Sequence, residues 1–252
     1  MGSRGFDSGL SSGSGLGERL GKARTSSDRG GERPPRIRAV IFDLWETLID
    51  WLIEESSVFR QELAATTAHT PERFAELWQE TYRLRETGSL ADAYRAVGVP
   101  EEELERLIDA RHALARRALV PRDGVVGTLQ ELRRRGLRLA VVSACTEDVP
   151  NVWPETAFAG LFDTEVFSAT CGYMKPDPEI FLLAAENLGV EPRDCLYVGD
   201  GANDELAGAE RVGMRSVLIQ RPGRDPYWPE VQGWTGPRIT AIPEVLELVE
   251  LV

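Results

Sequence analysis

The sequence has few cysteines and no pairing pattern among them. Its 252 residues include three cysteines, Cys145, Cys171 and Cys195, and no two of them form a C-x-x-C motif. An odd number of cysteines without such spacing indicates neither a disulfide framework nor a zinc site. We therefore expect free thiols and a reducing compartment, the cytoplasm.

Long apolar runs are also missing. No run approaches the roughly 18 residues needed to cross a bilayer, and the first residues lack the apolar core of a secretory signal. The formal net charge of -12 and the pI near 4.8 disfavour contact with nucleic acid or anionic membranes. We expect a monomer or homodimer whose partner is a small molecule, with no nucleic acid and no membrane.

Large apolar side chains are nearly absent from residues 1–35, which are rich in Gly, Ser and Arg. Such a segment cannot bury enough surface to offset its ordering entropy, so we expect a disordered tail. A strand-like run follows at Arg36–Phe42, and residues 50–120 have a helical pattern without strand-like runs. The sequence thus predicts an α/β core from residues 36–49 and 121–252, with a helical cap at 50–120 inserted between them.

The part of the chain after Pro121 alternates between strand-like and helix-like segments, which is typical of a Rossmann-like parallel sheet in an α/β protein. The expected strands are 137–142, 164–167, 195–198 and 215–219, and the expected helices are 124–135, 178–188, 203–212 and 243–251.

Chemically capable side chains follow the strand-like runs or lie in loops near their ends. Asp43 follows the first strand, Ser143 follows another, Lys175 lies in a loop, and Asp200 and Asp204 follow the run that ends at Val198. Because the carboxyl ends of parallel strands meet at one edge of a sheet, we expect these side chains to converge there. Converging carboxylates attract a hard divalent cation, usually Mg²⁺.

Together these groups suit phosphoryl transfer. An aspartate such as Asp43 can attack phosphorus and form an aspartyl-phosphate. Mg²⁺ offsets the repulsion between the anionic nucleophile and the anionic phosphate. Ser143 can donate a hydrogen bond to a phosphoryl oxygen, and Lys175 supplies a positive point charge. The residues therefore predict a Mg²⁺-dependent hydrolase of a small phosphorylated metabolite.

The same residues resemble the four motifs of the haloacid dehalogenase superfamily, over residues 37–219. The first motif is Asp43-Leu44-Trp45-Glu46-Thr47-Leu48, and the second is Ser143 after its apolar strand. The third is Lys175 with Pro176 and Pro178, and the fourth is Gly199-Asp200 with Asp204. The helical segment between the first and second motifs resembles the cap of the family's first cap class.

The resemblance implies roles for these residues. Asp43 is expected to be the nucleophile and a Mg²⁺ ligand, with the backbone carbonyl of Trp45 and the Asp200 carboxylate as further ligands. Asp204 is expected to bind the metal directly or through an intermediate group. Ser143, Ala144, Lys175 and Trp45 are expected to line the substrate site, where Lys175 also orients Asp43.

Trp45 departs from the family pattern. Family phosphatases usually carry an aspartate there, which protonates the leaving group and then activates water. Indole can do neither, and general acid–base help is typically worth about 10² to 10⁴ in rate. Three explanations remain open: a substrate with a good leaving group or its own acid, help from the adjacent Glu46, or a reaction other than ordinary monoester hydrolysis.

Two other functions are consistent with an aromatic side chain at this position. Family dehalogenases have a tyrosine here, and in such an enzyme Asp43 would attack carbon; the metal-binding form of the fourth motif argues against this alternative. A Schiff-base mechanism is excluded because no lysine lies between Asp43 and Lys175. The other alternative is a catalytically weak phosphate-binding or regulatory protein.

Overall fold

The structure is a computed structural model that describes residues 36–222 and 228–250. The disordered tail expected at residues 1–35 lies outside the described residues. Within the described ranges, none of the helices combines the length and the apolar character that a membrane span requires.

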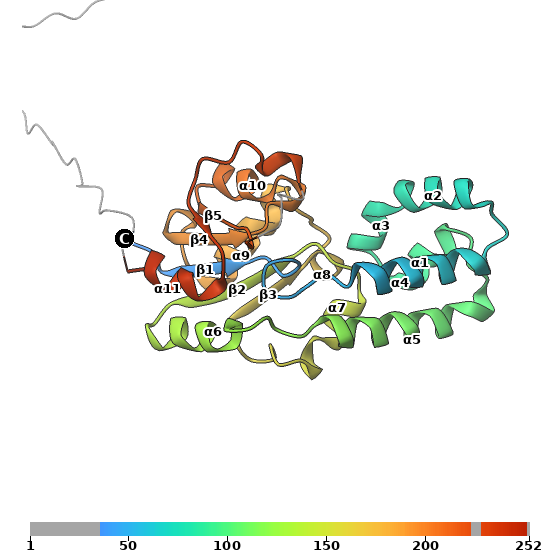
Figure 1. Cartoon of the computed structure of the whole chain (residues 1–252), viewed down its shortest axis with the longest axis horizontal. Helices are drawn as coiled ribbons and strands as arrows, with labels where there is room; N and C mark the ends of the chain where they lie inside the picture. The colour runs from blue at the N-terminus through green and yellow to red at the C-terminus, as the bar shows by residue number, and fades with distance from the viewer. Residues whose placement is uncertain (1–35, 223–227, 251–252) are drawn as a thin grey trace, which may run out of the picture. The chain divides into compact units, whose positions relative to one another are not determined.

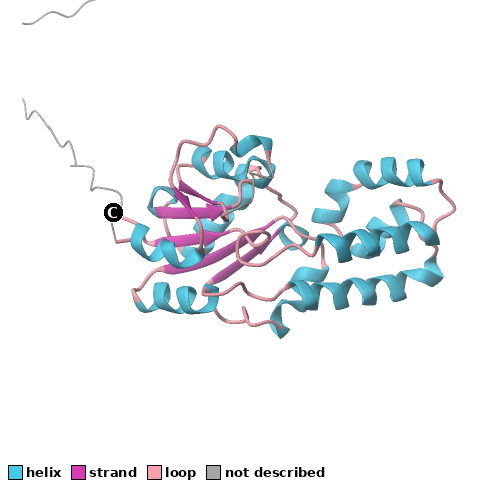
Figure 2. Cartoon of the chain, viewed as in Figure 1, coloured by secondary structure: helices cyan, strands magenta, loops and turns pink. Residues whose placement is uncertain are grey.

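In the described part of the chain, six parallel strands form one sheet at the core, in the order β3-β2-β1-β4-β5-β6 (Figure 2). This confirms the predicted α/β class. The order turns back between β1 and β4, and ligands of open α/β sheets bind at the carboxyl ends of the strands at such a point. The strands are β1 (Ala39–Phe42), β2 (Arg138–Ser143), β3 (Thr164–Phe167), β4 (Cys195–Gly199), β5 (Arg215–Ile219) and β6 (Arg238–Ile239).

Helices cover both faces of the sheet, because successive side chains of a strand point to opposite faces. In β1, Val40 and Phe42 belong to one hydrophobic cluster, and Ala39 and Ile41 belong to another. All four residues are fully buried, as expected of a parallel strand with both faces covered. The first cluster includes α6 (Val125–Arg134), α7 (Asp148–Val152) and α11 (Val245–Leu248), and the second includes α9 (Pro178–Leu188) and α10 (Glu205–Arg211) (Figure 1).

Residues 53–118, the helical insert, contain helices and no strand. Their apolar side chains, among them Leu63, Tyr94 and Leu107, form a hydrophobic cluster separate from the two that pack on the sheet. The insert therefore has a small core of its own. Its helices are α1 (Ile53–Thr66), α2 (Pro71–Glu80), α3 (Tyr82–Thr87), α4 (Leu90–Ala96) and α5 (Glu101–Ala118) (Figure 1).

The helical insert contacts loops at the carboxyl edge of the sheet. The N–H of Leu90 donates to Glu147 Oε2 at 2.8 Å, in the loop after β2. Arg111 forms an ion pair with the buried Asp148 at 3.0 Å, and Arg83 pairs with Asp177, just before α9, at 3.1 Å. These contacts place the insert beside the strand ends from which the predicted site residues come.

Some elements differ from the sequence expectations at their ends. The helix expected at 203–212 begins only at Glu205, because Asn203 and Asp204 both adopt left-handed backbone with φ of 54°. The helix expected at 243–251 is the short α11, preceded by a 3₁₀ turn at Ile242–Glu244. The two-residue strand β6 was not expected, since so short an edge strand has no readable periodicity.

Candidate active site

Three of the predicted site residues meet where the central strands end. Asp43 follows β1, Ser143 is the last residue of β2, and Asp200 follows β4. Parallel pairing aligns these ends: Phe42 lies opposite Val141 and Val198, and the N–H of Asp43 donates to Val198 O at 2.8 Å. Strand register therefore brings together side chains that lie up to 157 positions apart, from Asp43 to Asp200 (200 minus 43).

Lys175 reaches this strand edge from the loop before α9. Its buried ammonium donates to Asp43 Oδ1, to Glu205 Oε2 at 2.5 Å and to the Tyr197 hydroxyl at 3.4 Å. Burial alone would lower the pKa of Lys175, but the carboxylates of Asp43 and Glu205 outweigh it and raise the pKa above its usual value. The lysine is therefore a fixed positive charge between two acids.

Glu205, the first residue of α10, is a member of the site that the sequence reasoning missed. Its side chain is fully buried. Oε1 accepts the N–H of Gly201 at 2.9 Å, and Oε2 accepts the Tyr197 hydroxyl at 2.8 Å in addition to Lys175. A Cβ on Gly199 would lie 2.1 Å from Oε1, so glycine at 199 leaves the space that this carboxylate occupies. The available signal was a second acid directly after Asp204.

Asp204, which the sequence assigned to the metal site, points elsewhere in the structure. Its carboxylate pairs with Arg211 at 3.1 Å, and its side chain is 47% exposed. The left-handed backbone at Asn203 and Asp204 turns the chain so that the next residue, Glu205, faces the interior. The inward-facing acid of this turn is thus one position later than expected.

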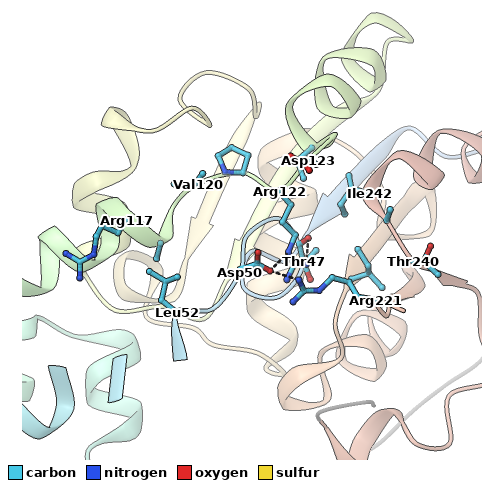
Figure 3. A pocket seen from close by; sticks show the side chains of 15 residues that line it. Thr47, Asp50, Leu52, Arg117, Val120, Arg122, Asp123, Arg221, Thr240 and Ile242 are labelled. Carbon is cyan, nitrogen blue, oxygen red and sulfur yellow. Dashed lines mark hydrogen bonds and ion pairs between the residues drawn. The ribbon is translucent and has the colours of Figure 1, made fainter. Parts of the chain in front are cut away.

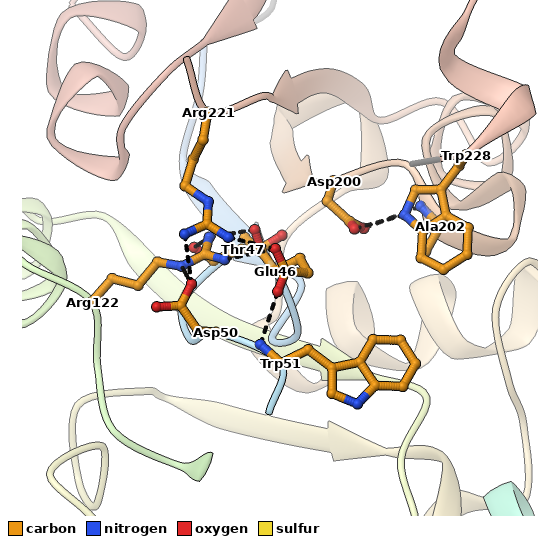
Figure 4. Close-up of polar contacts among 9 residues, drawn as sticks. All are labelled: Glu46, Thr47, Asp50, Trp51, Arg122, Asp200, Ala202, Arg221 and Trp228. Atoms are coloured by element: carbon orange, nitrogen blue, oxygen red, sulfur yellow. Dashed lines mark hydrogen bonds and ion pairs between the residues drawn. The ribbon is translucent and has the colours of Figure 1, made fainter. Parts of the chain in front are cut away.

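Asp200 is held by two donors (Figure 4). Its Oδ1 accepts the N–H of Ala202 at 3.1 Å, and its Oδ2 accepts the indole N–H of Trp228 at 2.8 Å. Burial and the nearby charge of Asp43 raise the pKa of Asp200 to about 6, while the two hydrogen bonds act in the opposite direction. Two carboxylates that repel each other in a partly dry site are a common setting for a bound cation.

The acidic cluster fits a hard divalent cation. Carboxylate oxygens of Asp43, Asp200 and Glu205 lie within 4.8 Å of one another. Asp43 Oδ2 is buried and has no hydrogen-bond partner among the described residues. Both oxygens of Asp200 and both oxygens of Glu205 accept hydrogen bonds, so Asp43 Oδ2 is the oxygen of this cluster that is left without one.

The loop after β2 is fixed by the protein's own contacts. Ser143 is buried, and its hydroxyl donates to Ala144 O at 3.3 Å. The backbone of Cys145 both donates to and accepts from the Ser168 hydroxyl, at 2.9 and 3.1 Å. Ser143 and Ala144 therefore stand on a rigid turn next to the strand end that carries Asp43.

Trp45 is half-buried and packs against the cluster on the α6 face of the sheet. Its ring centroid lies 6.4 Å from that of Trp51. Two indoles thus form an apolar wall beside the strand end, where neither ring supplies a carboxylate.

Glu46, next to Trp45, is held away from an acid–base role. Its Oε1 accepts the N–H of Trp51 at 2.8 Å, and its Oε2 pairs with Arg122 at 3.2 Å and Arg221 at 2.6 Å (Figure 4). Arg122 also donates to the backbone carbonyls of Glu46 and Thr47. The carboxylate therefore braces the loop that carries Asp43.

The two arginines that brace this loop also line a pocket of about 520 Å³ (Figure 3). Thr47, Asp50 and Arg117 are among the other residues around it, and none of the sequence-predicted site residues lines it. The residues that line the pocket are therefore different from those of the Asp43 cluster.

Replacing Arg122 with methionine is expected to lower the free energy of unfolding by about 2 to 3 kcal/mol, since charged hydrogen bonds are worth about that much and Glu46 loses a partner. Urea denaturation measures the change. Arg117→Met is the control, because Arg117 lies at the same pocket but is exposed, and among the described residues it forms one weak bond, to Ala113 O at 3.5 Å. Equal stabilities of the two variants would contradict the bracing role.

The structure thus combines a parallel α/β sheet, a helical insert after the first strand, and an acidic cluster with a lysine at the carboxyl edge of the sheet. The model of the haloacid dehalogenase-like hydrolase family matches residues 37–213. The chain belongs to that family of hydrolases.

Two relatives that match most of this chain are phosphatases. Glyceraldehyde 3-phosphate phosphatase from Methanopyrus kandleri is 33% identical over 202 residues, which are 73% of this chain and 84% of that protein. Phosphoglycolate phosphatase 1 from Pseudomonas aeruginosa is 30% identical over 194 residues, covering 74% of this chain and 70% of that protein. The solved HAD phosphatase from Thermococcus onnurineus shares the fold, with a TM-score of 0.66, 22% identity, and coverage of 84% of this chain and 98% of that one.

Proposed function

We propose that the protein is a Mg²⁺-dependent phosphatase that transfers the phosphoryl group of a small phosphorylated metabolite first to Asp43 and then to water. The observation that carries this proposal is the state of the Asp43 carboxylate. One oxygen is bound by Lys175, and the other is buried without a hydrogen-bond partner among the described residues, so it is oriented and unencumbered. Such a carboxylate can act as a nucleophile and form an aspartyl-phosphate.

Lys175 and Ser143 prepare the site for the anionic group. Lys175 fixes Asp43 Oδ1, which leaves Oδ2 as the attacking atom, and its positive charge favours a phosphoryl group nearby. The Ser143 hydroxyl, now bonded to Ala144 O, is a donor that can turn to a phosphoryl oxygen. Donors already in position stabilise developing charge without reorganisation cost.

The metal would be held by Asp43, Asp200 and the backbone carbonyl of Trp45. When bound, Mg²⁺ offsets the charges of nucleophile and phosphate and polarises a phosphoryl oxygen. Glu205 anchors Lys175 in this proposal, because its Oε2 accepts from the Lys175 ammonium and its Oε1 accepts the N–H of Gly201. Asp204, paired with Arg211, is left outside the ligand set.

The helical insert would act as the cap of this site. Ion pairs such as Arg83–Asp177 and Arg111–Asp148 hold it against the loops at the strand ends. A cap in this position would exclude water from the reaction and present side chains to the part of the substrate that bears no phosphate.

Phosphate release with and without metal tests the proposal. Purified protein with Mg²⁺ is expected to release phosphate from an activated aryl phosphate and from members of a metabolite panel. Excess EDTA should lower the rate by about 10²-fold or more, because a Lewis-acid cation contributes several kcal/mol to stabilising the transition state. Absence of phosphate release from every substrate would contradict the proposal. Halide release from a 2-haloacid that survives EDTA would instead favour attack on carbon.

A further inference from the structure

Trp228 reaches the acidic cluster from a part of the chain that the model of the hydrolase family does not match. That model covers residues 37–213, whereas Trp228 lies after β5, just before a 3₁₀ turn at Pro229–Val231. The indole N–H of Trp228 donates to Asp200 Oδ2 at 2.8 Å (Figure 4). A side chain from outside the matched residues therefore holds a carboxylate of the candidate metal site.

The segment that carries Trp228 packs closely on the turn after β4. Val231 is buried in the hydrophobic cluster that also contains Leu218, and its N–H donates to Trp228 O at 3.3 Å. A Cβ on Gly201 would lie 2.0 Å from Val231 Cγ1, so glycine at 201 permits this close approach. The Trp228 side chain packs against the same cluster. The indole is therefore positioned by packing as well as by its hydrogen bond.

Both donors that hold Asp200 are neutral. Its other oxygen, Oδ1, accepts the backbone N–H of Ala202 at 3.1 Å. The Lys175 ammonium pairs with Asp43 and Glu205 instead. An indole has a single N–H donor and carries no charge. Two such donors fix the direction of the carboxylate without cancelling the negative charge that attracts a cation.

Asp200 can accept these two hydrogen bonds and still bind a cation. A carboxylate has about four lone-pair sites on its two oxygens, and the two donors occupy one site on each oxygen. The oxygens of Asp43, Asp200 and Glu205 lie within 4.8 Å of one another. Carboxylates that bind metals are commonly hydrogen-bonded by a further group, and loss of that group typically lowers metal affinity by about 10- to 100-fold.

We propose that Trp228 is a positioning residue of the metal site, which holds Asp200 in the orientation that binds the divalent cation. This inference rests on the proposed function, which requires the same cation. The role needs no contact between the indole and the metal or the substrate. The opposite arrangement would be competition between the indole and the cation for Asp200 Oδ2, and removal of the indole N–H would then strengthen metal binding.

Calorimetric titration with Mg²⁺ alone, without substrate, tests the role. Trp228→Phe keeps an aromatic ring but removes the N–H, so the dissociation constant for Mg²⁺ should rise by about 10- to 100-fold. The matched control is Trp234→Phe, because Trp234 packs against the same hydrophobic cluster but donates to a backbone carbonyl, Pro237 O, at 3.1 Å. The Mg²⁺ affinity of this control should equal that of the unchanged protein.

The titration distinguishes failure of this role from failure of the metal site. Unchanged or tighter Mg²⁺ binding by Trp228→Phe would overturn the role of the indole. Absence of Mg²⁺ binding by the unchanged protein would refute the metal site of the proposed function, and this role with it.

Phosphate release separates an effect on the metal from an effect on the chemistry. The Mg²⁺ concentration that gives half the maximal rate should rise in Trp228→Phe by the same factor as the dissociation constant. At saturating Mg²⁺, kcat should stay within about threefold of that of the unchanged protein. A lower kcat that excess Mg²⁺ does not restore would contradict a role through the metal.

A measurement on the unchanged protein does not depend on the folding of any variant. The indole N–H of Trp228, followed by NMR, should exchange slowly with deuterated water because it is bonded to Asp200. Saturating Mg²⁺ should leave this exchange as slow as before or slower. Faster exchange in the presence of Mg²⁺ would show that the indole and the cation compete for the carboxylate, and would overturn the proposal.

Discussion

Replacing Asp43 with asparagine is expected to reduce phosphate release by at least about 10⁴-fold, the order seen when a covalent hydrolase loses its nucleophile. The amide keeps the shape of the side chain but has no anionic oxygen to attack phosphorus. The variant should also fail to accumulate a phosphorylated protein after acid quenching, whereas the unchanged protein should carry the phosphoryl group on Asp43. Mass spectrometry of the quenched protein measures this difference.

The matched control for Asp43 is Asp109→Asn, which makes the same chemical change at an exposed position of α5. Its rate should equal that of the unchanged protein. Asp43→Asn should retain its fold by circular dichroism, because Lys175 keeps its contact with Glu205. A correctly folded Asp43→Asn protein with more than a tenth of the original rate would rule out nucleophilic attack by Asp43.

Replacing Lys175 with methionine is expected to lower both the activity and the stability. Removal of one partner from a buried ion pair typically costs 3 to 5 kcal/mol, roughly, because the remaining charge stays buried without compensation. Here two buried carboxylates, Asp43 and Glu205, would lose their shared cation. The rate should fall by about 10² to 10³, as for the loss of a fixed electrostatic donor. Urea denaturation and phosphate release measure the two effects.

The double variant Lys175→Met with Glu205→Gln separates these effects. A neutral amide at 205 removes one of the two uncompensated charges, so the double variant should regain part of the unfolding free energy. It should not regain activity, because Asp43 still lacks the cation that orients it. Additive losses of stability in the two single variants would show that Lys175 and Glu205 do not act as a pair.

Much of the site could be predicted because several of its residues lie at the ends of strands. Asp43, Ser143 and Asp200 each directly follow or end a readable apolar strand, and a parallel sheet leaves them only one edge at which to meet. The adjacent acids Asp204 and Glu205 could not be ranked, because the left-handed backbone at Asn203 and Asp204 decides which one faces inward. Composition does not specify that turn.

The positions of side chains that are fixed by residues far away in the chain could not be predicted from the sequence. Glu46 is fixed by Arg221, which lies 175 positions away (221 minus 46), and no local pattern indicates that pair.

The separate core of the helical insert has a consequence for how this protein can change. Leu63, Tyr94 and Leu107 hold the insert together without using the side chains that hold the sheet. Substitutions in the insert can therefore be accommodated by its own core while the strand ends that carry Asp43 and Asp200 stay in place. In such an architecture, gradual mutation of the insert can lead to new substrates while the residues at the strand ends remain unchanged.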